Sequence, residues 1–143
     1  MEWTKAIGEA VLYIEENITN NITVDDVANH VCISTFYFHK GFSMLCGYPL
    51  KEYIRNRKLS LAGEELLSSS IAVTGLAIKY GYESPDSFTK AFIRFHGISP
   101  SAARKRKTML KAFAPLKLTI SLKGGYLMDY RITKKESFTV IAS

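Results

Sequence analysis

The sequence predicts an all-α protein in which two helix-turn-helix subdomains are joined by a long linker helix and followed by a short C-terminal extension that can contain strand. Three observations support this fold class. Apolar residues recur every three or four positions through most of residues 1–107, as one face of an α-helix requires. A helix-turn-helix pattern occurs twice, about fifty residues apart. A continuous helical pattern of about twenty residues lies between the two copies.

The N-terminal part of the chain contains an amphipathic helix and the earlier copy of the pattern. Apolar positions recur at helical spacing over residues 2–18. Thr23, with Asp26 three residues later, is an N-cap signature for the next helix. The following turn contains Cys32 where the later copy has glycine, so it either needs no positive φ or adopts one at some strain. Ser34 can cap the recognition helix after this turn.

The linker helix is predicted to start at Pro49 and to follow the run PLKEYIRNRKLSLAGEELLSS. About twenty residues at about 1.5 Å each make a rod of roughly 30 Å. Successive major grooves on one face of B-DNA are about 34 Å apart, so a rod of this length can place two recognition helices in adjacent grooves. Its basic cluster of Arg55, Arg57 and Lys58 is then expected to contact the intervening phosphates.

The later copy of the pattern, residues 71–100, is the clearer one. Gly81 ends its first helix and can adopt the positive φ that a tight turn between helices needs. Ser84 is a suitable N-cap, and Pro85 suits the first helical turn because proline lacks an N–H that would be unpaired there. Six positions of the two copies match at offsets of 49 to 51: Ala28, Ile33, Phe38, Phe42, Gly47 and Pro49 match Ala77, Tyr82, Phe88, Phe92, Gly97 and Pro100.

The predicted boundaries divide the chain into two parts. Residues 1–107 form the helical domain, with subdomain one at about 1–48, the linker helix at about 49–69 and subdomain two at about 70–107. Residues 108–143 alternate apolar and polar residues around Gly124 and Gly125, as strands do. We expect this C-terminal part to be a linker followed by the truncated start of a further domain.

Composition and cysteine spacing argue against several classes of protein. No apolar run approaches the roughly 20 residues of a membrane span, and the N-terminus lacks the order of a signal peptide. We therefore expect a cytoplasmic protein. Cys32 and Cys46 form no CxxC pair and lie beside no histidine cluster, which favours packed, reduced thiols over a metal site. No motif in the sequence predicts catalysis or a cofactor.

Positive charge is unevenly distributed along the chain, whose formal net charge is +6. Residues 1–34 carry one lysine and six acidic residues, whereas residues 35–111 carry 13 lysines and arginines and five acidic residues. The excess covers both predicted recognition helices and the linker helix, and such polarity attracts a polyanion. Surface solubility alone accounts for the charge of most basic proteins, but it does not explain why charge and repeat coincide here.

The earlier recognition helix combines aromatic and basic side chains outside its two inward phenylalanines. These side chains are Phe36, Tyr37, His39 and Lys40. The aromatic rings can pack on thymine methyl groups and sugars, while the basic side chains bond to base edges or phosphates. Alternatively, Phe36 and Tyr37 belong to the core, since a core assignment along a helix can be rotated by one position.

From Trp3 to Lys107 the chain resembles the AraC/XylS-type transcription regulators. The matching residues are Ala28, Ile33-Ser34, Phe38 and Phe42 in the earlier copy, YIRNRKL at 53–59 in the linker helix, and Ala77, Tyr80-Gly81-Tyr82, Phe88, Phe92 and Gly97-Ile98-Ser99-Pro100 in the later copy. The resemblance implies two helix-turn-helix subdomains on a long helix, in agreement with the prediction from the residues. It also implies sequence-specific binding of double-stranded DNA in successive major grooves, RNA polymerase as a further partner, and no enzymatic activity.

The resemblance further implies which residues contact DNA. Positions expected to face bases are Phe36, His39 and Lys40 in the earlier copy and Pro85, Asp86, Ser87 and Lys90 in the later copy. Expected backbone contacts, besides the basic cluster of the linker helix, are Ser34, Tyr37, Ser84, Thr89 and Arg94. The segment MDYRITKKESFTVIA is similar to the opening of a gyrase-inhibitor-like effector domain. A small-molecule effector is therefore expected only for a longer, full-length protein.

The alternative hypothesis is a non-catalytic helical module that binds RNA or a protein partner through the same basic face. A titration followed by fluorescence anisotropy separates the two hypotheses. Preference for one duplex sequence supports a transcription regulator, whereas sequence-independent binding that favours RNA supports the alternative.

Overall fold

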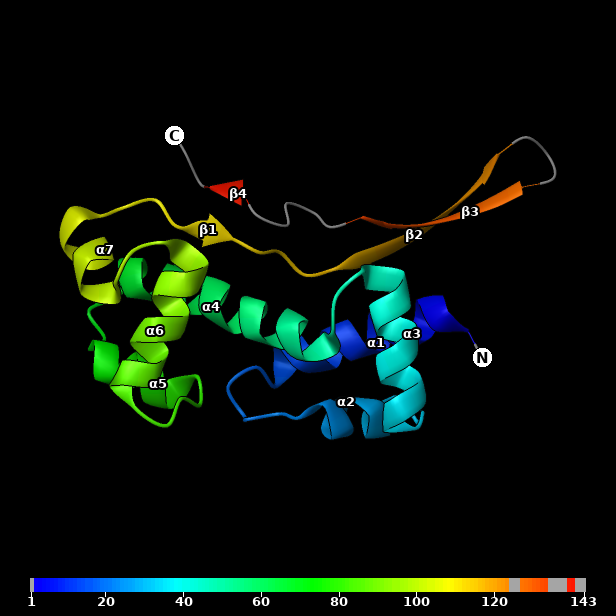
Figure 1. The fold of residues 1–143 in the computed structure, drawn as a ribbon, viewed down its shortest axis with the longest axis horizontal. Helices are drawn as coiled ribbons and strands as arrows, with labels where there is room; N and C mark the ends of the chain where they lie inside the picture. The colour runs from blue at the N-terminus through cyan, green and yellow to red at the C-terminus, as the bar shows by residue number, and fades with distance from the viewer. Residues whose placement is uncertain (1, 124–126, 134–138, 141–143) are drawn as a thin grey trace.

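Figure 1 shows the fold in a computed structural model of the chain. The structure describes residues 2–123, 127–133 and 139–140, so Gly124 and Gly125 lie outside the described residues. The helices within these ranges are α1 (Trp3–Glu16), α2 (Val24–His30), α3 (Thr35–Cys46), α4 (Leu50–Ser68), α5 (Val73–Lys79), α6 (Pro85–His96) and α7 (Pro100–Arg106). The predicted all-α fold class is confirmed. None of these helices combines the length and the apolar character needed to cross a membrane.

The two helix-turn-helix copies share one plan. Helices α2 and α5 have seven residues each, and helices α3 and α6 have twelve. Helix α3 ends at Gly47 with φ 84° and α6 ends at Gly97 with φ 81°. Both are left-handed C-caps, a conformation that glycine adopts without steric cost. The matching ends confirm the repeat that the sequence predicts.

The predicted N-caps are present in the structure. The Thr23 hydroxyl accepts the Asp26 N–H at 3.1 Å, and the Asp26 carboxylate accepts the Thr23 N–H at 2.8 Å. Ser34 Oγ accepts the Tyr37 N–H at 3.2 Å, and Ser84 Oγ accepts the Ser87 N–H at 3.1 Å. Each bond satisfies a backbone donor that a helix start would otherwise leave unpaired, so the start of each recognition helix is fixed locally.

The two turns differ in how they reach the left-handed conformation. Gly81 has φ 79°, and Cys32 has φ 60° although it carries a side chain. The earlier turn therefore does require a positive φ, and it meets that requirement at some steric cost. Cys46 is buried as predicted, but the prediction of a packed thiol is wrong for Cys32, which is exposed.

Each subdomain packs an aromatic core against α4. Phe38 and Phe42 are fully buried in subdomain one, as are Phe88 and Phe92 in subdomain two. Gly41 lets α1 approach α3 closely, because a Cβ there would lie 2.2 Å from the indole of Trp3. These contacts fix the rotation of both recognition helices, and therefore which of their side chains face outward.

Residues 110–116 run along α4 and are part of the core. Leu110, Phe113 and Leu116 are all buried. The Phe113 N–H donates to Ser60 Oγ at 2.9 Å, and the Leu116 N–H donates to the hydroxyl of Tyr53 at 3.1 Å. Side chains of α4 thus take the place of a neighbouring strand for this backbone. The segment continues the helical domain beyond α7.

His96 joins α6 to the same segment through a neutral ring. Burial lowers the pKa of His96 to about 4, although its bond to Leu59 opposes the shift. The Lys111 N–H donates to His96 Nδ1 at 3.2 Å, so Nε2 carries the proton and donates to the Leu59 carbonyl at 2.8 Å. The neutral ring therefore satisfies one backbone donor and one backbone acceptor.

The C-terminal extension contains strands, as its alternating pattern predicts. Strand β2 (Lys117–Lys123) pairs antiparallel with β3 (Leu127–Thr133), in a register that places Lys117 opposite Thr133. The two-residue strands β1 (Lys111–Ala112) and β4 (Thr139–Val140) pair in the same sense.

We expect Phe113→Ala to destabilise the helical domain by about 3–5 kcal/mol, because it removes a buried aromatic ring and leaves a cavity. The Phe113 ring packs at an angle against the rings of Tyr48 and Tyr53, at centroid distances of 6.3 and 5.8 Å. The measurement is urea denaturation followed by circular dichroism. Met109→Ala is the control, since Met109 is 43% exposed, and it should change stability by less than about 0.5 kcal/mol. Equal effects of the two substitutions would show that residues 110–116 are not part of the core.

We expect Cys32→Gly to raise the free energy of unfolding by about 1 kcal/mol, because glycine adopts the observed positive φ without strain. Gly81→Ala is the matched opposite change and should destabilise, since its Cβ would lie 1.8 Å from Asn21 Oδ1. Thermal unfolding under reducing conditions measures both. A lower melting temperature for Cys32→Gly would contradict the proposed strain.

Candidate nucleic-acid interface

The outward face of α3 is aromatic and basic. Phe36 is 75% exposed and Tyr37 is 52% exposed, and His39 and Lys40 are also exposed. The alternative that the two aromatic residues belong to the core is therefore wrong. The Lys40 ammonium lies 5.9 Å from the centre of the Phe36 ring, so a cation–π contact joins two neighbouring side chains of this face. The Tyr37 ring packs against the Trp3 ring of α1, with the ring centroids 5.5 Å apart.

The outward face of α6 is polar. Pro85, Asp86 and Lys90 are exposed, and the Lys90 ammonium lies 3.3 Å from the Asp86 carboxylate. Such an exposed pair one turn apart contributes little stability, so either group can exchange its partner for a base or a phosphate.

Ser87 and Thr89 are only half-exposed on α6. The Ser87 hydroxyl already donates to the Ser84 carbonyl at 2.9 Å and accepts the Ser84 N–H at 3.3 Å. This capping box occupies the group that was expected to face a base. Ser87 therefore has less hydrogen-bonding capacity for DNA than its position in the sequence suggests.

The basic cluster of α4 splits between surface and interior. Arg55 is exposed and Lys58 is half-buried, but Arg57 is buried at 5% exposure. Arg57 Nε and Nη2 donate to the Glu15 carboxylate at 2.6 and 2.8 Å, and Nη1 donates to the Phe113 carbonyl. Its predicted contact with phosphate is wrong, because every part of its guanidinium is directed at protein.

The pKa of Arg57 reflects these contacts. Burial alone lowers the pKa of a guanidinium, but the hydrogen bonds and the charge of Glu15 outweigh burial and raise the pKa of Arg57 above its ordinary value. The side chain therefore stays charged inside the protein, where it joins α1 to α4.

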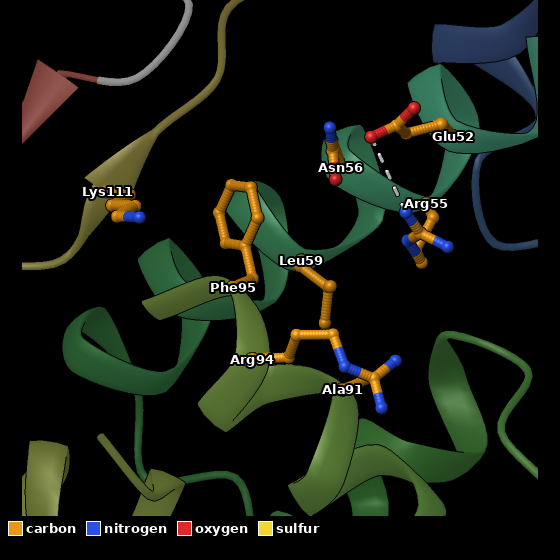
Figure 2. A pocket seen from close by; sticks show the side chains of 8 residues that line it. All are labelled: Glu52, Arg55, Asn56, Leu59, Ala91, Arg94, Phe95 and Lys111. Carbon is orange, nitrogen blue, oxygen red and sulfur yellow. Dashed lines mark ion pairs between the residues drawn. The ribbon is translucent and has the colours of Figure 1, made fainter. Parts of the chain in front are cut away.

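Arg55 and Arg94, two predicted backbone contacts, line one pocket of about 220 Å³. Figure 2 shows the two side chains entering the space between α4 and α6, with Leu59 and Ala91 beside them. Lys111 also lines this pocket and was not among the predicted contacts. Glu52 partly offsets the positive charge of this pocket, since its carboxylate lies 3.8 Å from the Arg55 guanidinium. The arrangement suits a phosphate group held between two guanidinium groups.

Met44 is a further outward residue that sequence reasoning missed. It is 78% exposed and lies one turn after Lys40 and two turns after Phe36. The spacing of four residues was the available signal, because it places all three on one face of the helix. An exposed row of this kind can contact the apolar surface of a DNA groove.

The two recognition helices stand at opposite ends of α4. Figure 1 shows α3 and α6 well separated, one near each end of α4, and running in the same direction. Helix α4 has 19 residues, which at about 1.5 Å each give a rod of about 28 Å. The protein's own core does not cover the outward faces of the two helices, because these residues are exposed: Phe36, Tyr37, His39 and Lys40 of α3 and Pro85, Asp86 and Lys90 of α6.

Known proteins with similar sequences also contain a helix-turn-helix domain. Residues 27–106 match the family described as a helix-turn-helix domain. The HTH-type transcriptional activator AarP of Providencia stuartii is 38% identical over 102 residues, which cover 71% of this chain and 76% of AarP.

Two solved structures share the fold. One is a transcriptional regulator with an AraC-type DNA-binding domain from Chromobacterium violaceum, with a TM-score of 0.68 and 23% identity over 72% of this chain and 92% of that one. The other is the DNA-binding domain of AdpA in complex with a target DNA, with a TM-score of 0.66 and 25% identity over 71% of this chain and 91% of that one. With this fold and the sequence matches, the chain belongs to the AraC-type helix-turn-helix family of DNA-binding transcription regulators.

Proposed function

We propose that a single chain binds a specific duplex with α3 and α6 in two successive major grooves. The observation that carries this proposal is the pair of recognition helices at the ends of a 19-residue helix, both with uncovered outward faces. The rod of about 28 Å is of the same order as the groove repeat of about 34 Å, and α3 and α6 lie at its two ends. The AdpA domain, which shares this fold and whose structure includes a target DNA, supports DNA binding by the fold.

Base recognition then falls to the exposed residues of both helices. On α3, His39 and Lys40 donate to base edges and Phe36 packs on thymine methyl groups. On α6, Lys90 donates to guanine and Asp86 accepts from a cytosine amino group. Pro85 and Ser87 contact DNA mainly through van der Waals contacts at the start of α6. Proline has no N–H to donate, and the serine hydroxyl is already bonded in the helix cap.

Phosphate contacts position the protein without selecting a sequence. The pocket that Arg55 and Arg94 share receives one phosphate between the grooves. Further phosphate contacts fall to side chains at the starts of the recognition helices and to one lysine of α4: Ser34, Tyr37, Ser84, Thr89 and Lys58. Apart from Lys58, these residues lie at or near helix starts, where the partial positive charge of a helix N-terminus favours phosphate.

Two further partners are part of the proposal, RNA polymerase and a small-molecule effector. RNA polymerase is the expected partner of a bound activator, and AarP is itself named a transcriptional activator. Residues 108–143 would lead into an effector-binding domain of the gyrase-inhibitor-like type, which the strands β2 and β3 support. The effector would be a small molecule, and the site of action would be the cytoplasm.

We expect Lys90→Ala to weaken binding to the selected duplex about tenfold or more, because a lost base contact costs roughly 1–3 kcal/mol. Binding to random duplex should change far less. The operator comes from selection on a random duplex library, and fluorescence anisotropy measures both affinities. Lys5→Ala is the control, since Lys5 is an exposed lysine of α1 and lies on neither recognition helix. Equal losses on both duplexes would remove Lys90 from the base-reading residues.

We expect Arg55→Ala to weaken binding to selected and random duplexes alike and to lower the salt slope by about one. Arg57→Ala should instead destabilise the fold by about 3–5 kcal/mol, because it leaves the Glu15 carboxylate without its partner. Affinity measured across a salt series and urea denaturation separate the two effects. A smaller salt slope for Arg57→Ala at unchanged stability would contradict its structural role.

A further inference from the structure

A pocket of about 530 Å³ lies between the two subdomains, and we call it the interdomain pocket. Its walls are residues 22–25 at the start of α2, one face of α4 from Lys51 to Lys58, and the turn 80–82 between α5 and α6. The volume falls in the range of roughly 300–1,000 Å³ that is usual for small-molecule sites. Both subdomains contribute to it, so an occupant would touch both.

The lining of the interdomain pocket has an apolar part and a cationic part. Ile22, Val24 and Ile54 form the apolar part together with the rings of Tyr80 and Tyr82. The cationic part comes from α4, where the lining residues are Lys51, Arg55 and Lys58. Their spacing of four and three residues places the three cations on one face of the helix. Asp25 is the one acidic residue in the described lining.

Lys58 is the cation that most needs an anionic partner. It is half-buried, and burial lowers the pKa of its ammonium group. No carboxylate within the described ranges pairs with it. An ammonium group that has lost part of its water is stabilised when an anion replaces that water.

The two tyrosines differ in what their hydroxyl groups can do. The Tyr80 hydroxyl already donates to Glu65 Oε1 at 3.0 Å. Burial raises the pKa of Tyr82, and the nearby charge of Arg55 only opposes that shift. The Tyr82 hydroxyl therefore keeps its proton and can donate to an anion.

We propose that the interdomain pocket binds a small organic anion, a carboxylate on an aromatic or short apolar body. The carboxylate accepts from Lys58, Arg55 and the Tyr82 hydroxyl, while the apolar body covers Ile54 and the Tyr82 ring. A bare phosphate would use the cations but would leave the apolar half of the lining in contact with water.

The test is a titration of the full 143-residue chain with 2-naphthoate, followed by amide NMR shifts. We expect saturable shifts at residues 22–25 and 80–82, with a Kd of about 1 mM, as roughly 0.3 kcal/mol per heavy atom gives for a ligand of this size. The neutral amide, 2-naphthamide, should bind about tenfold more weakly or worse. Absence of saturable shifts at these residues would overturn the proposal.

Two variants and a matched control locate the carboxylate. Lys58→Met keeps the apolar stem and should weaken naphthoate binding about tenfold. Tyr82→Phe removes one hydroxyl and should weaken it severalfold, which keeps the test valid if Lys58→Met fails to fold. Lys5→Met, at an exposed lysine of α1 outside this pocket, should leave the affinity unchanged. Equal affinity for wild type and both pocket variants would overturn the proposed site.

A parallel titration with inorganic phosphate distinguishes a site for an organic anion from a site for a DNA phosphate. We expect phosphate at the same concentration to produce little shift at residues 22–25 and 80–82. If phosphate shifted these amides as strongly as naphthoate does, the apolar half of the pocket would contribute nothing. That result would indicate that the pocket binds a DNA phosphate, and it would overturn the proposal. The proposed DNA-binding function would be unaffected.

Discussion

One buried guanidinium joins the elements on which the recognition helices depend. Arg57 lies near the middle of α4, pairs with Glu15 of α1 and donates to the carbonyl of Phe113. Taking a charge out of water costs free energy that an ion pair offsets only with good geometry, and here two nitrogens meet one carboxylate. The cost of leaving either partner alone disfavours any arrangement that separates α1 from α4. Subdomain one is thereby fixed to the linker helix.

A second arginine has a similar role near the C-terminus of α4. Arg104 of α7 donates to the Leu66 carbonyl through Nε at 3.1 Å and Nη2 at 3.0 Å, which satisfies an acceptor near the end of the helix. Helix α4 is therefore tied to α1 near its middle and to α7 near its C-terminus. A rod can set the distance between two grooves only if it is held in this way. The Arg57 guanidinium donates only to protein groups and is unavailable to DNA, whereas Arg55 and Arg94 are exposed.

Local features of this fold could be predicted from the sequence because caps, turns and helical period depend on adjacent residues. Thr23 and Asp26 show this, since their mutual bonds involve only their own short segment. The burial of Arg57 was not predicted, because counting the charges along a helix does not say on which side of the helix each charge lies. A signal existed: Arg57 follows the buried Tyr53 by four residues, which places it on the buried side of α4. Its partner Glu15 is 42 residues away, and no pattern in the sequence joins the two. The pocket shared by two helices depends on tertiary packing in the same way.

The two recognition helices offer DNA different chemistry. The outward face of α3 carries Phe36 and Met44 around Lys40, whereas that of α6 carries Asp86 and Lys90. Apolar side chains distinguish thymine by its methyl group, and charged side chains distinguish bases by their donors and acceptors. A dimer of identical helices matches a palindrome, but one chain with two unlike helices matches an asymmetric sequence. The bound protein is then held in one direction along the duplex, and its other surfaces face a fixed side of the promoter.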